Sequence, residues 1–572
     1  MRGDESAKLD ALIGRIWSAI EDSPLAGQTV FAVVSDHGMN NVAGIYSQTF
    51  SLPDLLNSPE GGAHHVVTNR HQLDQFKLAG LDPLVSKVVN ESTASFYLQG
   101  QASKYPTAWL DLDGNERASV SLRNSDLNEI HILLQQLSRK DLPPRMRHAV
   151  VSYFEQTMAR LRPKWNDVTQ GLQTELDSLR RAIAQRETEQ KRNKRKWSAA
   201  DRSRGLDKEA RRKVVEASDW RTEAGRYANY LDHLKALLSL HPPESGPLRG
   251  AIETLVPERS LGDPNDVYNL QHYVVGPSSE GLVMRDDGTL DGERSFRRVN
   301  YFQLLASQRA RNNPQPAVPV KPVDFVATAL PCDHLVTAPS VPGVLRQAIW
   351  IYGDEEHQIV ELVSRPKESE ENEILLIPIA HLRQSSSGVV EWDAREWTPG
   401  FPLELFEDPQ LTLQDNAQRV QWLSGWHSER DWFRAIYKCR YSNGVIGLTE
   451  EFLPPSYALP AHAGEEAGLH DLELRRRQLV QTDFEVFAAD HWNFNVRNFN
   501  PGGNHGSFLT ISTHSVWMMA GAGIPRGKQI QEPYDSLNFG STLLHLVNRP
   551  VPLPGRVVNL DVNSNTALSP VR

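Results

Sequence analysis

The sequence predicts an α/β protein whose sheet is covered by helices on both faces, with a helical hairpin and a β-rich segment inserted in mid-chain. Three observations support this fold class. Apolar strand-like runs and amphipathic helical patterns occur together near both ends of the chain. A charged stretch over residues 145–241 has helical periodicity. Short runs rich in β-branched and aromatic residues, separated by turn residues, follow it.

The composition is that of an ordinary globular protein. The 572 residues are 39% hydrophobic and carry a formal net charge of −10, which argues against a dedicated nucleic-acid binder. No apolar run approaches the roughly 18 residues that a membrane span needs. Cys332 and Cys439 form no CxxC pair. They are compatible with one disulfide or with two buried thiols, so they leave the cellular compartment open.

The first 23 residues predict an amphipathic helix, and they lack the charged and apolar regions of a signal peptide. One face of this helix carries Leu9, Leu12, Ile13, Ile16 and Ile20. A strand, "TVFAVV", follows at residues 29–34. A helix with such an apolar face needs a surface to pack on, so we expect this segment to belong to a larger α/β layer.

The strand runs directly into Ser-Asp-His-Gly, and this junction is the first candidate site. A continuous apolar run is typical of a strand covered on both faces, so we expect the strand to be central in its sheet. Ligands of open α/β sheets bind beyond the carboxyl ends of such strands, where Asp36 and His37 lie. Gly38 permits a sharp turn, and a carboxylate with an imidazole suits zinc. The alternative is an Asx-turn with a solvated histidine; the whole stretch "VVSDHGM" favours metal.

A second candidate is His505, which lies in the loop "NPGGNHGSF". Glycines at 502, 503 and 506 let the backbone fold closely around whatever the imidazole contacts. The alternative is a flexible surface loop. If the two stretches form one site, His505 should lie within about 10 Å of Asp36 and His37, as ligands of neighbouring metal ions would.

Two further groups contain histidine. Asp490 and His491 could line the same pocket, but the neighbouring Trp492 and Phe494 favour a structural role. The stretch "GGAHHVVTNRHQ" is a candidate substrate pocket, in which histidines and an arginine would bind phosphate; a solvated loop is the equal alternative. Its residues are His64, His65, Arg70 and His71.

The middle of the chain predicts two insertions. Residues 145–241 predict two long helices in a coiled-coil hairpin, with the basic tip Lys191–Lys196 as a solvated face. Residues 246–480 predict a β-rich segment that shapes the site and then returns to the core. Its expected strands are "KPVDFVATAL", "RQAIWIYG", "HQIVELVSRP", "EILLIPIAHL" and "GVVEWDA".

Together, "VVSDHGM", "GGNHGSF" and the closing "PYDSLNFGSTLLHLV" resemble the alkaline phosphatase superfamily, closest to type I phosphodiesterases and nucleotide pyrophosphatases. The resemblance implies an alkaline-phosphatase-like core over residues 1–125 and 480–572. It also implies two divalent ions, usually zinc, with Asp36 and His37 on one and His505 on the other. A small phosphoester would be the substrate, and full-length family members are expected to be exported or periplasmic.

The sequence departs from the family pattern in two ways. Asn538, Phe539 and Gly540 replace the proline form of the closing helix. The family's Ser or Thr nucleophile and three further metal-binding side chains lie before the SDHGM strand, where this sequence has one amphipathic helix. We therefore expect an N-terminally incomplete, impaired metal-dependent hydrolase of phosphoric esters. The alternative is a non-catalytic binding or scaffold protein that retains the fold.

Overall fold

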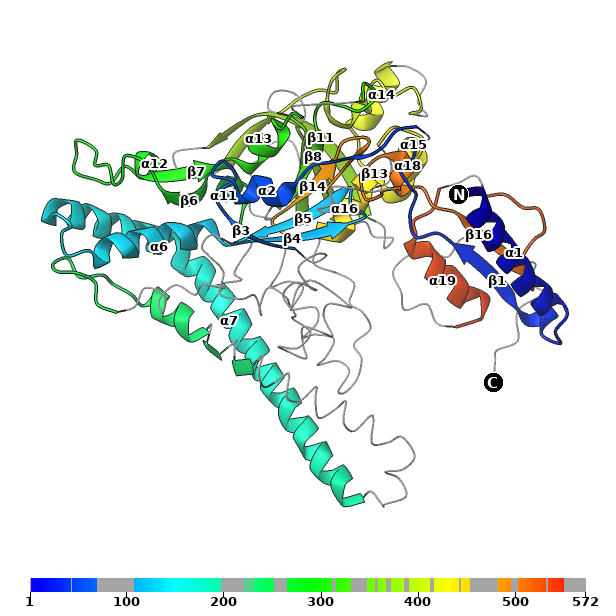
Figure 1. Cartoon of the computed structure of the whole chain (residues 1–572), viewed down its shortest axis with the longest axis horizontal. Helices are drawn as coiled ribbons and strands as arrows, with labels where there is room; N and C mark the ends of the chain where they lie inside the picture. The colour runs from blue at the N-terminus through cyan, green and yellow to red at the C-terminus, as the bar shows by residue number, and fades with distance from the viewer. Residues whose placement is uncertain are drawn as a thin grey trace.

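The computed structural model describes most of the chain. The described residues are 2–42, 44–68, 107–196, part of 221–250, 265–310, 315–330, 347–354, 359–366, 372–384, 390–411, 416–441, 444–452, 482–494, 503–530 and 533–549. They form a mixed α/β structure with one large sheet, as predicted, and a smaller unit that projects at one end (Figure 1). None of the described helices is long and apolar enough to span a membrane.

The large sheet has ten strands. All its pairings are antiparallel except that of β3 with β4. In spatial order its strands are β12 (Val390–Ala394), β11 (Asn372–Gln384), β10 (Ile359–Pro366), β9 (Gln347–Tyr352), β8 (Val323–Leu330), β14 (Phe484–Ala488), β5 (Arg117–Leu122), β4 (Thr107–Asp113) and β3 (His65–Thr68), with β13 (His427–Ser428) beside β11.

The five strands expected between residues 321 and 394 are confirmed as β8 to β12. Their β-branched and aromatic residues pair in long antiparallel ladders, the arrangement that such residues favour. They share one sheet with strands from the predicted core, since β8 pairs with β14. One sheet therefore contains strands of both the predicted core and the predicted β-rich insertion. The boundaries between these segments remain a prediction.

The sheet is buried on both faces, as the strand β9 shows. Ala348 and Trp350 pack in one apolar cluster, and Ile349 and Ile351 pack in another. The first cluster also contains residues of α2 (Leu52–Asn57), α11 (Val267–Gln271) and α13 (Tyr301–Ala306). The second contains residues of α14 (Asn416–Leu423), α15 (Glu429–Ile436) and α16 (Gly444–Phe452). We call the sheet with these helices the sheet body.

A helical arm extends from the sheet body (Figure 1). It consists of α6 (Ser125–Ser138) and the 53-residue helix α7 (Pro144–Lys196), beside the strands β6 (Tyr273–Pro277) and β7 (Phe296–Val299) and the short α12 (Gly292–Ser295). Leu231 and Leu234 pack in one apolar cluster with Leu176 and Leu179, so the chain returns along α7. The side chains of the basic tip, Lys191–Lys196, lie outside the described residues.

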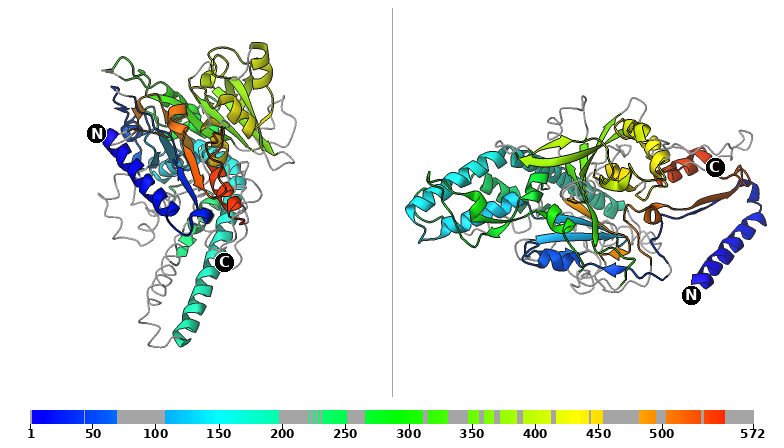
Figure 2. Two further views of the ribbon diagram at one scale, coloured as in Figure 1. Left: turned by 90° about the vertical axis from the view of Figure 1, so that its right-hand side faces the viewer. Right: turned by 90° about the horizontal axis from the view of Figure 1, so that it is seen from above.

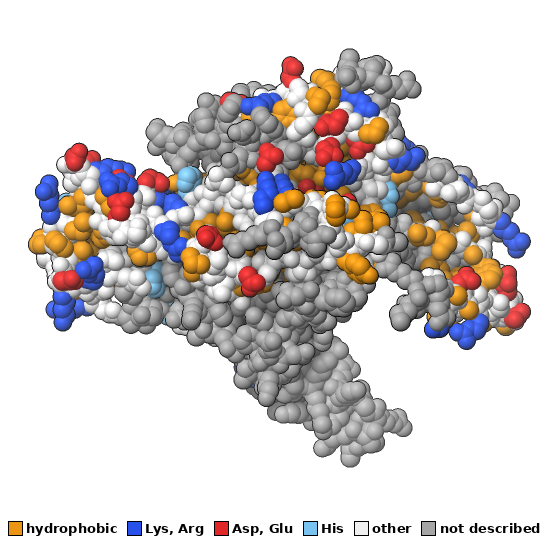
Figure 3. Space-filling view, turned by 45° about the horizontal axis from the view of Figure 1, so that its top comes forward, with side chains coloured by type: hydrophobic (Ala, Val, Ile, Leu, Met, Phe, Trp, Pro, Cys, Tyr) orange, Lys and Arg blue, Asp and Glu red, His pale blue; other side chains and the backbone are white. Residues whose placement is uncertain are grey.

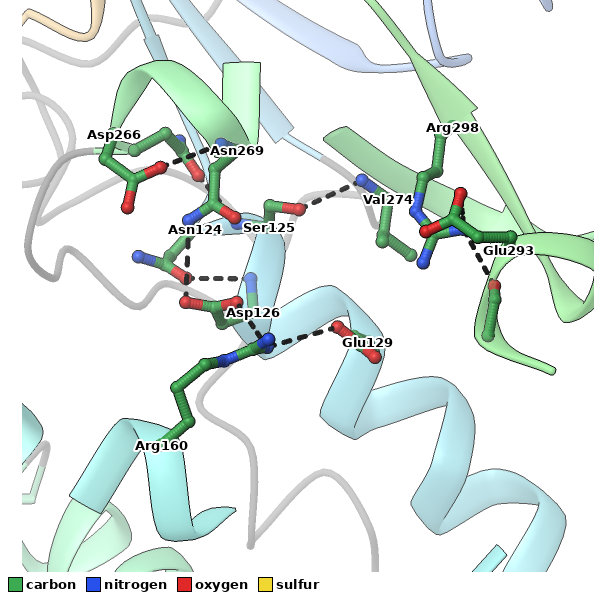
Figure 4. A network of polar contacts seen from close by, with 12 residues as sticks. Asn124, Ser125, Asp126, Glu129, Arg160, Asp266, Asn269, Val274, Glu293 and Arg298 are labelled. Carbon is green, nitrogen blue, oxygen red and sulfur yellow. Dashed lines mark hydrogen bonds and ion pairs between the residues drawn. The ribbon is translucent and has the colours of Figure 1, made fainter. Parts of the chain in front are cut away.

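A polar network fixes the start of this arm (Figure 4). Asn124 caps α6 by accepting a hydrogen bond from the backbone N–H of Asp126 at 2.9 Å. Arg160 of α7 lies 3.6 Å from the Asp126 carboxylate and 3.9 Å from that of Glu129. Burial raises the pKa of the Glu129 carboxyl. The network ties α6 to α7, so we interpret it as structural.

The projecting unit, which we call the ribbon unit, has two strands in the part of the chain that the structure describes. Its elements are α1 (Arg2–Glu21), β1 (Val30–Val34), β16 (Trp517–Gly521) and α19 (Leu537–Leu546). β1 pairs antiparallel with β16, from Val30 opposite Gly521 to Val34 opposite Trp517. The helices lie on opposite faces of this pair (Figures 1 and 2), with Trp17 of α1 against Phe31 and Phe539 of α19 against Trp517.

The expectation that the strand at residues 30–34 is central in its sheet is wrong. Among the described residues the strand has one neighbour, β16, which runs antiparallel to it. Its apolar sequence reflects helices on both faces, as α1 and α19 show. An apolar run indicates that both faces of a strand are covered, but it does not indicate how many strands pair with it.

The ribbon unit leaves much of its apolar surface uncovered. Apart from Val320, every exposed large hydrophobic residue in the described part of the chain lies between residues 9 and 46 or between 511 and 547. The ribbon unit supplies Leu9, Leu12, Ile16, Leu25, Val34, Val516, Met518, Ile530 and Val547. Figure 3 shows orange side chains on this end of the molecule. None of its described residues enters the three apolar clusters.

Candidate functional site

The candidate site lies where the ribbon unit meets the sheet body. One side is the loop after β1, which carries Asp36 and His37. The other is the loop before α18 (Thr510–Thr513), which carries His505. Asn40 and Asn504 join the loops in an antiparallel bridge, in which each backbone N–H donates to the other carbonyl at 2.6 and 3.2 Å.

The two predicted histidines touch. The rings of His37 and His505 stack with centroids 3.3 Å apart and planes inclined by 13°. The predicted proximity of His505 to His37 is therefore confirmed, although most of the chain separates them in sequence. The Asp36 side chain is 85% exposed and that of His37 is 32% exposed, so this edge of the pair is open to solvent.

The orientation of His37 leaves one ring nitrogen facing the carboxylate. Its Nδ1 lies 2.6 Å from the carbonyl oxygen of Gly38, and the ring donates a proton there in the matching tautomer. Its Nε2 then faces Asp36 Oδ1 at 3.4 Å. Two ligand atoms of a tetrahedral zinc ion, each about 2.0–2.1 Å from the metal, are themselves about 3.4 Å apart. The spacing of this pair thus fits a zinc ion, and it also fits a direct contact between the imidazole and the carboxylate.

Gly38 is required by its surroundings. A Cβ at this position would collide with the carbonyl oxygens of Ile511 and His514. The Gly38 N–H donates to the carbonyl of Ser512 at 3.1 Å, which holds the loop against α18. Gly38 was expected to permit a sharp turn, and its surroundings show that it also permits a close approach of two backbones.

The turn between β4 and β5 holds the backbone of His505. The His505 N–H donates to the Gly114 carbonyl at 2.9 Å, and the Glu116 N–H donates to the His505 carbonyl at 3.0 Å. Gly114 has φ +61°, and a Cβ there would collide with the His505 carbonyl. The loop is thus anchored to the sheet body through the turn between β4 and β5.

Glu116 is a residue of the site that the sequence analysis missed. It is 1% exposed, and its carboxylate accepts hydrogen bonds from the hydroxyls of Ser507 and Ser512 at 2.7 and 2.5 Å. Burial raises the pKa of its carboxyl. The available signal was the stretch "DGNE" between two strands, where a glutamate follows a tight turn.

The second Asp-His pair packs beside the site. Asp490 accepts a hydrogen bond from the Asn40 side chain at 3.1 Å, while the His491 side chain is 7% exposed. Trp492 and Phe494 are buried in the main apolar cluster, as their sequence context indicates. Asp490 therefore supports the loop after β1 through Asn40.

His64 lies in the core of the sheet body. It is fully buried, and its Nε2 is hydrogen-bonded to the Tyr301 hydroxyl, which also donates to the Gly61 carbonyl at 3.1 Å. Burial lowers the pKa of His64 to about 3. Neither a phosphate-binding wall nor a solvated loop describes this residue. The side chain of His65, and Arg70 and His71, lie outside the described residues.

The residue types at the site suit a divalent ion, but too few of their side chains converge to hold one firmly. Imidazole nitrogen and carboxylate oxygen are zinc ligands, and the Asp36–His37 spacing suits them. Within the described ranges, however, no three His, Cys, Asp or Glu side chains converge closely enough to hold a metal ion. A catalytic zinc normally has about three protein ligands, so these residues alone would bind one weakly.

Comparison with known proteins identifies a family over the first part of the chain. Residues 2–129 match the family described as type I phosphodiesterase / nucleotide pyrophosphatase. This match confirms the resemblance for the stretch that contains "VVSDHGM", whereas the two later motifs lie outside the matched residues; it indicates a hydrolase of the phosphodiesterase or pyrophosphatase type. No curated protein and no solved structure matches the chain.

Proposed function

We propose that this chain, related through residues 2–129 to the type I phosphodiesterases and nucleotide pyrophosphatases, is a metal-dependent hydrolase of small phosphoric esters. The observation that carries the proposal is the stack of His37 on His505 beside the Asp36 carboxylate. Metal-binding residue types from two distant segments meet at one point, since Asp36 and His37 lie within the matched residues and His505 lies far beyond them.

The chain's own residues would act as follows. Gly38 orients the His37 ring, and Asp36 and His37 together offer one nitrogen and one oxygen to a cation. His505 offers its imidazole from the opposite loop. A divalent ion bound there, zinc being the family's usual one, would stabilise the charge that develops on the phosphoryl oxygens during displacement. With three candidate ligands in all, we expect weak binding and slow turnover.

Turnover of an aryl phosphodiester tests this function. The 572-residue chain should release nitrophenol slowly from bis(p-nitrophenyl) phosphate when Zn²⁺ is present, and a chelator should stop the reaction. Asp36→Asn and His505→Ala should each lower the rate at least tenfold, because each removes a ligand. His241→Ala is the matched control, since His241 also faces a carboxylate, Glu155 at 2.9 Å, on the arm.

Two results would count against the proposal. Turnover that survives both the chelator and the two substitutions would show that the chemistry lies elsewhere. No zinc-dependent turnover at all would favour the alternative, a non-catalytic binding or scaffold protein of this fold. The lack of three converging ligand side chains among the described residues is the observation that supports that alternative.

A further inference from the structure

Beneath the two histidine loops lies a buried polar cluster that the proposed chemistry does not use. Asn40, Asn504, Ser507 and Ser512 are each no more than 2% exposed, and the Glu116 carboxylate is 1% exposed among them. Burying a carboxylate away from water is costly unless hydrogen bonds replace the lost hydration. The neighbours of Glu116 therefore indicate what this residue does.

One oxygen of Glu116 gathers donors from separate segments. Its Oε2 accepts from the Ser507 hydroxyl at 2.7 Å, the Ser512 hydroxyl at 2.5 Å and, at 3.4 Å, the Ser507 backbone N–H. The Asn40 side chain lies close enough to the same carboxyl group to lower its pKa, against the larger effect of burial, which raises it. Ser507 follows His505 by two residues, Asn40 follows His37 by three, and Ser512 belongs to α18, whose backbone holds Gly38.

The backbone of Glu116 completes the arrangement. Its N–H donates to the His505 carbonyl at 3.0 Å, and its carbonyl accepts from the Ala488 N–H of β14 at 2.8 Å. Glu116 thus connects both histidine loops to the sheet body through side chain and backbone at once.

We propose that Glu116 is a positioning residue that keeps the His37 loop and the His505 loop together, so that both imidazoles can meet one cation cluster. The part that concerns a cation rests on the proposed function; the part that concerns the loops does not. Residues that orient metal ligands typically change metal affinity by about 10–100-fold when they are substituted. A glutamine would keep the shape but would accept hydrogen bonds less strongly than a carboxylate.

The test compares Glu116→Gln with Glu485→Gln in the full chain. Glu485 is also 1% exposed and accepts a hydrogen bond from a serine, Ser119 at 3.1 Å, but it lies within the sheet on β14. Without metal, amide hydrogen exchange of residues 36–42 and 503–512 should speed up about tenfold in Glu116→Gln and remain unchanged in Glu485→Gln. With Zn²⁺ as the probe, Glu116→Gln should raise the dissociation constant about 10–100-fold, and Glu485→Gln should not.

The outcomes separate the two ideas. Unchanged exchange of both loops in Glu116→Gln would overturn the positioning role. Faster exchange in a protein whose wild type binds no Zn²⁺ would support that role and count against the proposed function. Zinc affinity equal to that of the wild type would overturn the role towards the cation. If Glu116→Gln does not fold, Ser507→Ala and Ser512→Ala each remove one donor and should change exchange in the same direction.

Discussion

The sheet body and the ribbon unit have the same kinds of sequence pattern, but they differ in how far their apolar side chains are buried. Both combine apolar strands with amphipathic helices, yet the body encloses its apolar residues in clusters on both faces of the sheet. The ribbon unit leaves Leu9, Leu12 and Met518 about half exposed. The candidate site joins the two: His37 extends from the ribbon unit, whereas His505 is fixed to the body. The half of the site that faces solvent is therefore the half with the weaker support.

The largest expected difference between the two regions concerns leucine truncation. Leu110 of β4 is fully buried, whereas Leu12 of α1 is 45% exposed. Leu110→Ala should destabilise the protein by about 2–5 kcal/mol because it leaves a cavity. Leu12→Ala should change the stability by no more than about 0.5 kcal/mol. Urea unfolding of the two variants measures both effects.

Equal losses from the two substitutions would break the comparison, because they would mean that Leu12 is as well packed as Leu110. A buried Leu12 would then require α1 to be covered in solution.

A smaller effect separates the buried histidine of the sheet body, His64, from the half-buried site histidines. His64 has its pKa lowered to about 3 by burial, so the folded state binds fewer protons than the unfolded state below about pH 6.5. Its contribution to stability is therefore present above pH 6.5 and is lost as the pH falls towards 3. Between pH 7 and pH 5 the wild type should lose about 2 kcal/mol more than His64→Gln.

Urea titrations at the two pH values measure this loss, with His241→Gln as the control on the exposed arm. If His64→Gln and the wild type lost stability in parallel, His64 would have to be accessible to water. That result would again favour a substrate pocket around His64.

The sequence predicted the positions of helices and strands along the chain better than it predicted which elements pack beside one another. The helix over residues 1–23 and the strands β8 to β12 follow from periodicity and turn residues, which are local signals. The proximity of His37 and His505 was expected from the family resemblance of their two loops. The position of β1 was mispredicted because apolar residues report contacts above and below a strand and not its number of partners.

Glu116 was missed for a related reason. Its role depends on Ser507 and Ser512, which lie almost 400 residues away in sequence, and nothing near it marks a buried acid. His64 was misjudged because its burial depends on Tyr301, another distant residue. Long-range contacts decided all three cases.

The central claim is that Asp36, His37 and His505 serve one cluster of two cations, with Asp36 and His37 on one ion and His505 on the other, and equilibrium binding of Zn²⁺ tests it most directly. The account predicts saturable binding to this cluster in the wild type. Asp36→Asn, His37→Ala and His505→Ala should each weaken this binding at least tenfold, because each removes a ligand. Zinc binding by His505→Ala and His37→Ala with wild-type affinity would contradict the claim, since the stacked histidines would then be a structural contact alone.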